Sequence, residues 1–576
     1  MNQKLENILN VSLDATEDEL RKADSLSTGY NWRDNTWEII VKYSGSLESI
    51  RNRYNVYIKE LLNYYAIIVA DKATIELISQ EDVIDYVEKP KSLYYQIERT
   101  KTAACVGNVR AGGGILSGKG VIVGVIDTGI DIFDNAFRNS DGTTRILNIY
   151  DQTTGEKYDK QSIDEYIKLN EDLSGGTFSY DNAPGVDNIM HGTDVSYIAA
   201  GSLGVAYEAD IIAVKMGYSI NNQFPRTTSL MDAIDYVIRK AIEYRKPVAV
   251  NISYGCNYGA HNGNTLLESF IDDISKSYRC VICVGSGNEA DKAIHFGGII
   301  NTGQVQTAYL SVGEYQSAMD IQIWKNYWDT IDVMLINPRG EQIGIITEGK
   351  INRYETYNTE IITLLGEPSP YNIYQEIYIN LIPKTDYILS GIWQIVLMAG
   401  SIRAGEYNIW LPSSQALGYA TAFNNPTADG TITIPATARN CIAVGAYNAY
   451  TNSYAAFSGR GFDNSIRNVN AGVKPDITAP GVDISIARQR GNDIIYRNVT
   501  GTSYAVPVVT GAAALLMQWG IVMGNDRFMY GEKLKAALID GSKPVGLAGI
   551  IGNDNHPDPR TGWGAVCLMN TLNKIL

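Results

Sequence analysis

The sequence has little histidine, cysteine or positive charge, and each shortage excludes a class of function or limits the candidate residues for one. Its 576 residues include only four histidines, so few side chains are candidates for a general base. Six cysteines in so long a chain do not make the disulfide framework of a small secreted protein. A formal net charge of −15 argues against binding the phosphate backbone of nucleic acid, which requires a basic face. We therefore expect no nucleic-acid partner.

Long apolar segments are also missing. Residues 1–12 lack the apolar core and small-residue cleavage site of a classical signal peptide. No run reads as a membrane span. We therefore expect no membrane partner, and a protein that is cytoplasmic in the producing cell or leaves it by a route the sequence does not show.

Two of the cysteines, Cys280 and Cys283, have the spacing of a redox or metal-binding motif. They lie in a predicted strand, where residues three apart face opposite sides of a sheet, and no second pair accompanies them. We therefore expect both to be buried structural residues.

What the sequence does have is a helix of small and apolar residues that begins near Ser503. From Tyr504 to Leu516 the residues are nearly all Ala, Val, Gly and Leu, which predicts a helix buried on every side. A hydroxyl at the N-terminus of such a helix lies beside unpaired backbone N–H groups and the positive end of the helix dipole, which would stabilise an oxyanion. Ser503 is therefore a candidate nucleophile. The alternative is a plain N-cap role.

A serine nucleophile requires a base, and His191 is the best candidate. It opens a second small-residue helix after a loop rich in Gly, Asn and Asp. Upstream, residues 120–126 form an apolar run typical of a strand buried on both faces, and the run ends in Asp127. Open α/β sheets place ligand sites at this end of their strands. The chain order Asp127, His191, Ser503 is one of the known orders of a Ser-His-Asp triad.

The residues around this triad resemble the three catalytic motifs of the subtilase (subtilisin-like, S8) family of serine proteases. The matching segments are Asp127-Thr-Gly, His191-Gly-Thr and Gly501-Thr-Ser503-Tyr-Ala-Val-Pro507, with further similar segments at 204–215, 250–255, 284–289 and 474–481. The resemblance implies a parallel sheet flanked by helices, and serine endopeptidase activity on protein substrates through an acyl-enzyme.

The same resemblance assigns residues to the substrate cleft. Val284-Gly-Ser-Gly-Asn288 is similar to the oxyanion-hole loop, which implies that the side-chain amide of Asn288 binds the oxyanion. The alternative is that Asn288 is a turn residue. Glycines in the cleft would let a substrate backbone approach closely. The implied substrate-binding residues are Ser253, Tyr254, Gly255, Gly285, Ser286 and Gly287.

Residues 1–97 are predicted to form a separate α+β domain, with strands at 37–43, 65–70 and 83–88 and helices at 47–62 and 74–79. Its position before the catalytic strand, and its tail from Lys89 to Gln96, resemble a subtilase propeptide. The resemblance implies self-cleavage near Tyr95 or Gln96 and a propeptide that acts as a bound inhibitor. The alternative is a packing domain that is never cut.

An all-β insertion is predicted between two parts of the catalytic domain, residues 98–304 and 429–576. Residues 305–428 carry short alternating strands that predict a β-sandwich or jelly roll. We expect a clamp that rigidifies the protease, with sugar binding by exposed tryptophans as the alternative. A propeptide, this insertion and the missing secretion signal together resemble the Csp germination proteases of clostridial spores. That resemblance implies a spore-associated enzyme that cleaves a cortex-lytic zymogen during spore germination.

Two positions depart from the family pattern. Asp194 stands where many subtilases repeat a histidine, and Pro507-Val-Val replaces the frequent Pro-His-Val. A carboxylate at 194 that faced the cleft would raise the basicity of His191.

Two other functions remain open. One is a catalytically silent subtilase-fold sensor or regulatory partner, and the other is a transferase that uses the same acyl-enzyme. No cofactor is expected. Calcium is suggested by family analogy alone, because no loop has a readable ligand spacing.

Overall fold

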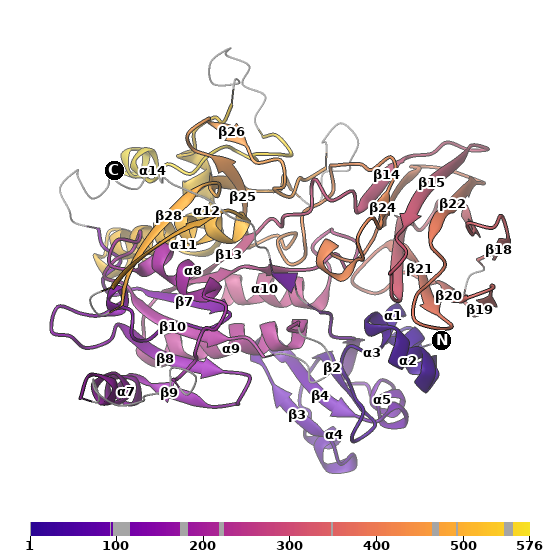
Figure 1. Ribbon diagram of the computed structural model, residues 1–576. Coiled ribbons are helices and arrows are strands. Elements are labelled where there is room, and N and C mark those ends of the chain that lie inside the picture. The colour runs from indigo at the N-terminus through magenta and orange to yellow at the C-terminus, as the bar shows by residue number, and fades with distance from the viewer. Residues whose placement is uncertain are drawn as a thin grey trace.

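The computed structural model describes residues 2–92, 94–95, 116–172, 183–217, 224–346, 349–462, 472–490, 493–546 and 557–576. In this part of the chain the elements form a central α/β unit, an N-terminal unit and an inserted β unit. Figure 1 shows the inserted unit at the right and the N-terminal unit below, with the central unit at the left.

The central unit is built on a nine-stranded sheet, as counted over the described residues. Its inner strands run parallel, and β7, β11 and β13 are buried along their whole length, as their continuous apolar runs predict. The strand order is β26 (Ser453–Tyr454), β25 (Ile442–Asn448), β13 (Cys280–Gly285), β11 (Val248–Ile252), β7 (Ile122–Asp127), β10 (Asp210–Lys215), β8 (Ile146–Asp151) and β9 (Lys157–Asp159), with β27 (Ile477–Pro480) also paired to β25.

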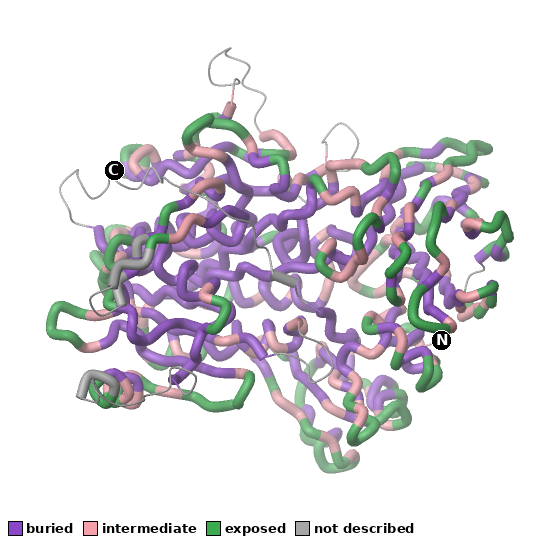
Figure 2. The backbone as a smooth tube through the Cα atoms, viewed as in Figure 1, coloured by how far each residue is buried: buried purple, intermediate pink, exposed green. Residues whose placement is uncertain are grey.

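Helices cover both faces of this sheet and leave it almost wholly buried (Figure 2). One face carries α7 (Lys160–Asp172), α8 (His191–Ala200), α11 (Thr502–Met517), α12 (Gly531–Asp540) and α14 (Leu568–Ile575). The other carries α9 (Thr227–Tyr244) and α10 (Leu266–Ser277). Cys283 packs into the first core and Cys280 into the second, so the two thiols are buried on opposite faces, as predicted.

The expectation about membrane spans needs one correction. The helical stretch Thr502–Val522 is long and apolar enough to cross a membrane by length and composition. However, 83% of its most apolar window is buried inside the fold. Because α11 packs against α8 and the sheet, its apolar character belongs to a core helix.

The N-terminal unit is a five-stranded antiparallel sheet in the described residues, with helices around it. The helix predicted over 47–62 is wrong beyond Arg53. The Tyr- and β-branched-rich residues that follow form β3, which pairs with the edge of β4. Three short helices before β1 were not predicted. The strands are β1 (Tyr30–Asn31), β2 (Thr36–Tyr43), β3 (Tyr57–Glu60), β4 (Tyr65–Ala70) and β5 (Ile84–Glu88), and the helices are α1 (Asn7–Asp14), α2 (Glu17–Lys22), α3 (Asp24–Ser27), α4 (Glu48–Arg53) and α5 (Lys72–Ile78).

The inserted unit consists of two antiparallel sheets around one core, so its all-β character is as predicted. The jelly-roll connectivity stays a prediction. The unit includes β14, before the expected boundary at residue 305, and buries Trp393 and Trp410. One sheet has the order β14 (His295–Ile299), β23 (Glu406–Trp410), β16 (Met319–Asn326), β21 (Tyr374–Pro383), β20 (Thr359–Leu365) and β19 (Ile351–Glu355); the other has β18 (Gln342–Ile345), β17 (Ile331–Ile336), β22 (Gly391–Ala399), β15 (Val305–Val312) and β24 (Ala422–Phe423).

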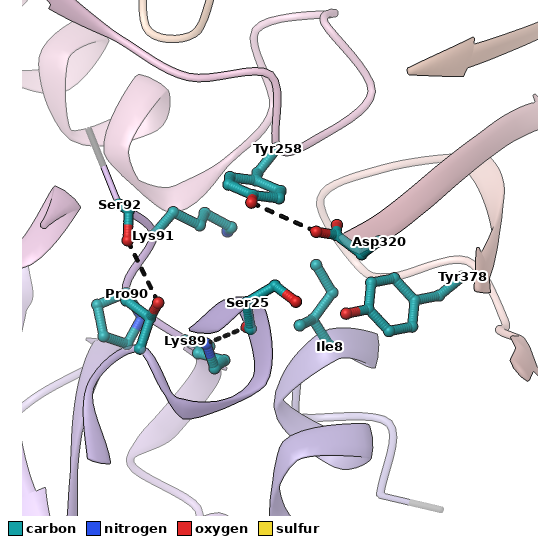
Figure 3. Close-up of a pocket in the computed structure, with 10 residues that line it drawn as sticks. Ile8, Ser25, Lys89, Pro90, Lys91, Ser92, Tyr258, Asp320 and Tyr378 are labelled. Carbon is teal, nitrogen blue, oxygen red and sulfur yellow. Dashed lines mark hydrogen bonds between the residues drawn. The ribbon is translucent and has the colours of Figure 1, made fainter. Parts of the chain in front are cut away.

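All three units meet at one junction. Ile40 and Tyr65 of the N-terminal sheet pack into the core formed by α9 and α10, and Tyr378 of the inserted unit packs into the N-terminal core. Figure 3 shows the small cavity at this meeting point. There the Lys89 ammonium donates to the Ser25 carbonyl at 2.7 Å, and the Tyr258 hydroxyl donates to Asp320 at 3.4 Å. The N-terminal unit is therefore held by the central and inserted units together.

Candidate active site

Asp127 and His191 meet as the chain order suggested. Asp127 ends β7 and His191 begins α8, and the His191 Nδ1 lies 2.6 Å from Asp127 Oδ1. Both side chains are buried. Burial opposes protonation of the imidazole, but the Asp127 carboxylate, with Asp187 and Asp194 nearby, outweighs it and raises the pKa of His191 above its ordinary value. The arrangement favours an imidazole held in one orientation and made more basic.

A buried carboxylate, Asp187, ties the loop before α8 to the end of β7. Its Oδ1 accepts from the Thr128 hydroxyl at 2.7 Å, and its Oδ2 accepts from the Thr193 N–H at 2.8 Å. Gly192 is needed because a Cβ there would lie 2.3 Å from the Gly129 carbonyl oxygen. The Asp-Thr-Gly and His-Gly-Thr segments therefore interlock, and this contact sets the position of His191.

Ser503 is the second residue of α11, and α11 packs against α8. The N-cap position is Gly501, so Ser503 does not serve as the N-cap. The ring of Tyr504 lies 5.2 Å from the His191 ring, centroid to centroid. The packing of the two helices thus brings the first turn of α11 to the imidazole.

Asn288 lies at this same helix end. Its Oδ1 accepts from the backbone N–H and the hydroxyl of Thr502, at 3.0 and 3.2 Å. Its Nδ2 is buried and has no hydrogen-bond partner in the described part of the chain. An amide whose oxygen is fixed and whose buried N–H₂ group has no partner among the described residues is suited to donate to an oxyanion that forms beside Ser503.

The predicted substrate strand already holds an extended segment. β12 (Tyr254–Gly255) pairs in antiparallel fashion with β6 (Tyr94–Tyr95), with Tyr254 opposite Tyr95 and Gly255 opposite Tyr94. The tail of the N-terminal unit therefore lies along β12, the strand predicted to bind substrate, in the manner of an added peptide strand. Gln96, the other predicted cleavage residue, lies outside the described residues.

Comparison with known families agrees with this geometry. The model of the subtilase family matches residues 118–369 and 404–564, and the model of the Csp protease B prodomain matches residues 3–91. The chain belongs to the subtilase family. It is accordingly a serine endopeptidase of the hydrolase class by family, with a prodomain ahead of the catalytic unit.

Solved and curated subtilases show how far the likeness extends. The CspB protease of Clostridium perfringens is 34% identical, with a TM-score of 0.74 over 82% of this chain and 96% of that one. The subtilase-type proteinase RRT12 of Saccharomyces cerevisiae is 33% identical over 22% of this chain and 23% of its own length. Subtilisin-like protease 10 of Arthroderma otae is 34% identical over 21% of this chain. The match covers 27% of the length of that relative. This subtilase therefore spans only about a quarter of the length of the two curated relatives named here.

The remaining predicted pocket residues lie on or next to β12 and β13. The Ser253 hydroxyl lies 3.4 Å from the Ser503 carbonyl oxygen, and the Ser286 and Ser458 hydroxyl oxygens are 3.2 Å apart. Gly287 follows β13 with a φ of +94°, and a Cβ there would meet Thr433 at 2.5 Å. Gly285 ends β13. The binding roles of these residues stay predictions.

The carboxylate of Asp194 is bound by two arginines that the sequence did not suggest as its partners. Its two carboxylate oxygens face Arg488 Nε at 3.2 Å and Arg497 Nη1 at 3.1 Å, both on the hairpin of β28 (Ile484–Arg490) and β29 (Asp493–Val499). Burial raises the pKa of Asp194 to about 6 although both arginines lower it. Asp194 therefore acts on His191 through space, while its direct contacts go to the hairpin.

Sequence reasoning missed several residues that shape this site. Asp187 lies just before the predicted histidine helix, and its nearness to His191 was the only available signal. Arg488 gave none, because its partner is distant in the chain. Glu289 directly follows Asn288 in the segment that resembles the oxyanion loop, and that adjacency was a usable signal.

Other chemistry-bearing residues lie apart from the site. His261 and His295 stack on Trp410, with ring centroids 4.2 and 4.9 Å away, where the inserted unit joins the central one. His556 lies outside the described residues. Over the residues that the structure describes, no group of three or more His, Cys, Asp or Glu side chains is placed to hold a metal ion.

Proposed function

We propose that this subtilase cleaves protein substrates by a Ser-His-Asp acyl-enzyme mechanism. The observation that carries the proposal is the 2.6 Å contact between His191 and Asp127 beside the helix that bears Ser503. The buried Nδ2 of Asn288 at the same helix end supports it.

The residues take the following roles. His191 accepts the Ser503 proton as the hydroxyl attacks the scissile carbonyl, and Asp127 stabilises the imidazolium through Nδ1. The Asn288 amide and backbone N–H groups at the start of α11 bind the oxyanion. His191 then protonates the leaving amine, and water releases the acyl-enzyme.

The N-terminal unit is proposed to be a propeptide that is cut near Tyr95 or Gln96 and inhibits the enzyme by occupying its cleft. The antiparallel pairing of Tyr94 and Tyr95 with β12 supports this reading, because a substrate would bind in the same extended way. A packing domain that is never cut would have no need to enter the cleft.

We further propose that the physiological substrate is a cortex-lytic zymogen and that the enzyme is spore-associated. The likeness to the CspB protease and to the Csp protease B prodomain supports this assignment. Incubation with such a zymogen should give one limited cleavage, absent with Ser503→Ala. General degradation, or no cleavage, would contradict it.

The deciding experiment compares the intact mass of wild type and Ser503→Ala. Wild type should appear as two pieces, the smaller about one sixth of the 63.3 kDa chain, and the variant should stay whole. If both stay whole and Ser503 does not react with a fluorophosphonate probe, the protein is a silent sensor with a subtilase fold and the proposal fails.

A further inference from the structure

A carboxylate from the residue after Asn288 is bound by the inserted unit. Glu289 is buried, with 7% of its surface exposed. Its Oε2 accepts from the backbone N–H of Ser414 at 3.1 Å, and its Oε1 accepts from the Ser414 hydroxyl at 3.2 Å. One residue of the inserted unit therefore satisfies both oxygens of a side chain in the oxyanion loop.

Ser414 is itself firmly placed. It begins a short 3₁₀ turn between β23 and β24. On either side of this turn, the N–H of Leu411 donates to the Ile294 carbonyl and the N–H of Phe423 donates to the Ala293 carbonyl, both at 2.9 Å. The segment that carries Ser414 thus runs alongside the chain that leaves the oxyanion loop and is hydrogen-bonded to it on both sides of the turn.

The contact matters because a buried carboxylate needs both of its acceptor sites satisfied. Burial raises the pKa of Glu289 to about 7, while the bonds from Ser414 oppose that rise. Lys292 favours the ionised form and Asp291 disfavours it. Loss of the Ser414 donors would leave Glu289 without these bonds beside Asn288, and the loop would have to rearrange.

We propose that Glu289 and Ser414 are positioning residues through which the inserted unit holds the oxyanion loop, so that the Asn288 amide points at the developing oxyanion. The inference rests on the proposed function and deepens it. It gives the inserted unit a role in catalysis that is local and separable from any general stiffening of the fold. Neither residue touches the substrate in this mechanism.

The test follows self-cleavage of the full chain after a pulse of cell-free synthesis, at mildly alkaline pH, where Glu289 is ionised. Glu289→Ala should slow self-cleavage about tenfold to a hundredfold, as expected when a catalytic group is displaced by a fraction of an ångström to 1 Å. Ser414→Ala removes one of the two bonds and should slow it less. Glu289→Gln keeps one acceptor oxygen and should recover part of the rate. Asp291→Asn removes a carboxylate from an exposed neighbour and should self-cleave at the wild-type rate.

A second measurement separates positioning from a structural role. On a fluorogenic peptide ending in Ser-Leu-Tyr-Tyr-Gln, Glu289→Ala should lower kcat and weaken a peptide aldehyde inhibitor in parallel, with KM unchanged. The aldehyde forms a tetrahedral oxyanion, whereas the substrate ground state does not.

Three outcomes would overturn the inference: wild-type self-cleavage in Glu289→Ala and Ser414→Ala, a KM-only effect, or no recovery in a folded Glu289→Gln. If wild type and Asp291→Asn do not self-cleave either, the proposed protease function fails. That outcome differs from failure of the positioning inference, in which wild type does self-cleave.

Discussion

Arg488 places its Nε 3.2 Å from the Oδ1 of Asp194, and this contact joins the histidine helix to the hairpin that leads into the Ser503 helix. Arg497 pairs with the other oxygen of the same carboxylate. The side chain of Asp194 is fully buried, so the charges of this cluster are poorly screened and reach His191. The hairpin therefore helps to set the basicity of the proposed catalytic base.

Replacing Asp194 should shift the pH dependence of the enzyme. As the proposed base, His191 acts only when neutral, and Asp194 is one of the groups that raise its pKa. Asp194→Asn should therefore move the acid limb of kcat/KM to lower pH. Arg497→Gln removes a cation that lowers the pKa of Asp194, so more of this carboxyl is protonated near pH 6, and the limb should move in the same direction by a smaller amount. A pH–rate series on a peptide substrate checks both, with the exposed Asp540→Asn as the control; an Asp194→Asn profile that matches wild type would remove the hypothesis.

Removing the Asn288 amide should affect the chemical step alone. In subtilisin, a member of the same family, loss of the equivalent donor costs about 10² to 10³ in kcat. Asn288→Ala should show a fall of that order with KM little changed. Steady-state kinetics measures it, and a rise in KM at constant kcat would show that Asn288 binds substrate instead.

Enlarging Gly192 should separate Asp127 from His191. A Cβ at this position would lie 2.3 Å from the Gly129 carbonyl oxygen and 3.0 Å from Asp127 Cβ, so β7 and α8 would have to move apart. Gly192→Ala should lower the free energy of unfolding by about 1–3 kcal/mol and abolish rapid self-cleavage. Denaturant unfolding of Ser503→Ala with and without the change measures the stability effect in uncleaved chains. Equal stability would mean that the two segments do not interlock.

The junction of the three units should weaken as pH rises. At this junction Glu88 accepts from the Leu266 N–H at 2.8 Å, and Glu376 accepts from the Asn7 amide at 3.2 Å. Burial raises the pKa of Glu88 to about 7 and that of Glu376 to about 8, with Glu6 raising and Lys91 lowering both. A carboxyl whose folded pKa lies above its unfolded value contributes stability that is complete below the unfolded pKa and is lost as pH rises through the folded one. Burial lowers the pKa of Lys89, at the same junction, to about 7, and this buried amine contributes in the opposite sense. Because the two carboxyls outnumber it, melting temperature should still fall between about pH 6 and 9.

Glu376→Gln tests that dependence. It keeps the shape of the side chain without an ionisable proton, so the fall in melting temperature should become shallower in uncleaved Ser503→Ala protein. Glu367→Gln, at an exposed neighbour, should leave the fall unchanged. A melting temperature that rises with pH in the parent protein would contradict the assignment.

The local chain pattern predicted the central unit well. A continuous apolar run ending in Asp127 predicts a buried parallel strand, and the small-residue segments after His191 and Ser503 predict core helices, because each pattern follows from the period and burial of one element. Cys280 and Cys283 were assigned correctly for the same reason. Where local propensity was ambiguous, as in the residues after Arg53, pairing with β4 decided the structure.

The sequence by itself determined the family and the candidate triad: Asp127, His191 and Ser503 lie in segments whose residue types and order identify a subtilase. Only the tertiary structure decided their surroundings. That Asp194 faces Arg488 and Arg497, that Ser414 binds Glu289, and that Tyr94 and Tyr95 lie along β12 are contacts between residues far apart in the chain. Such pairings produce no pattern in the sequence of either segment, because they depend on how separate units pack. They form because a buried charge is costly unless it is paired.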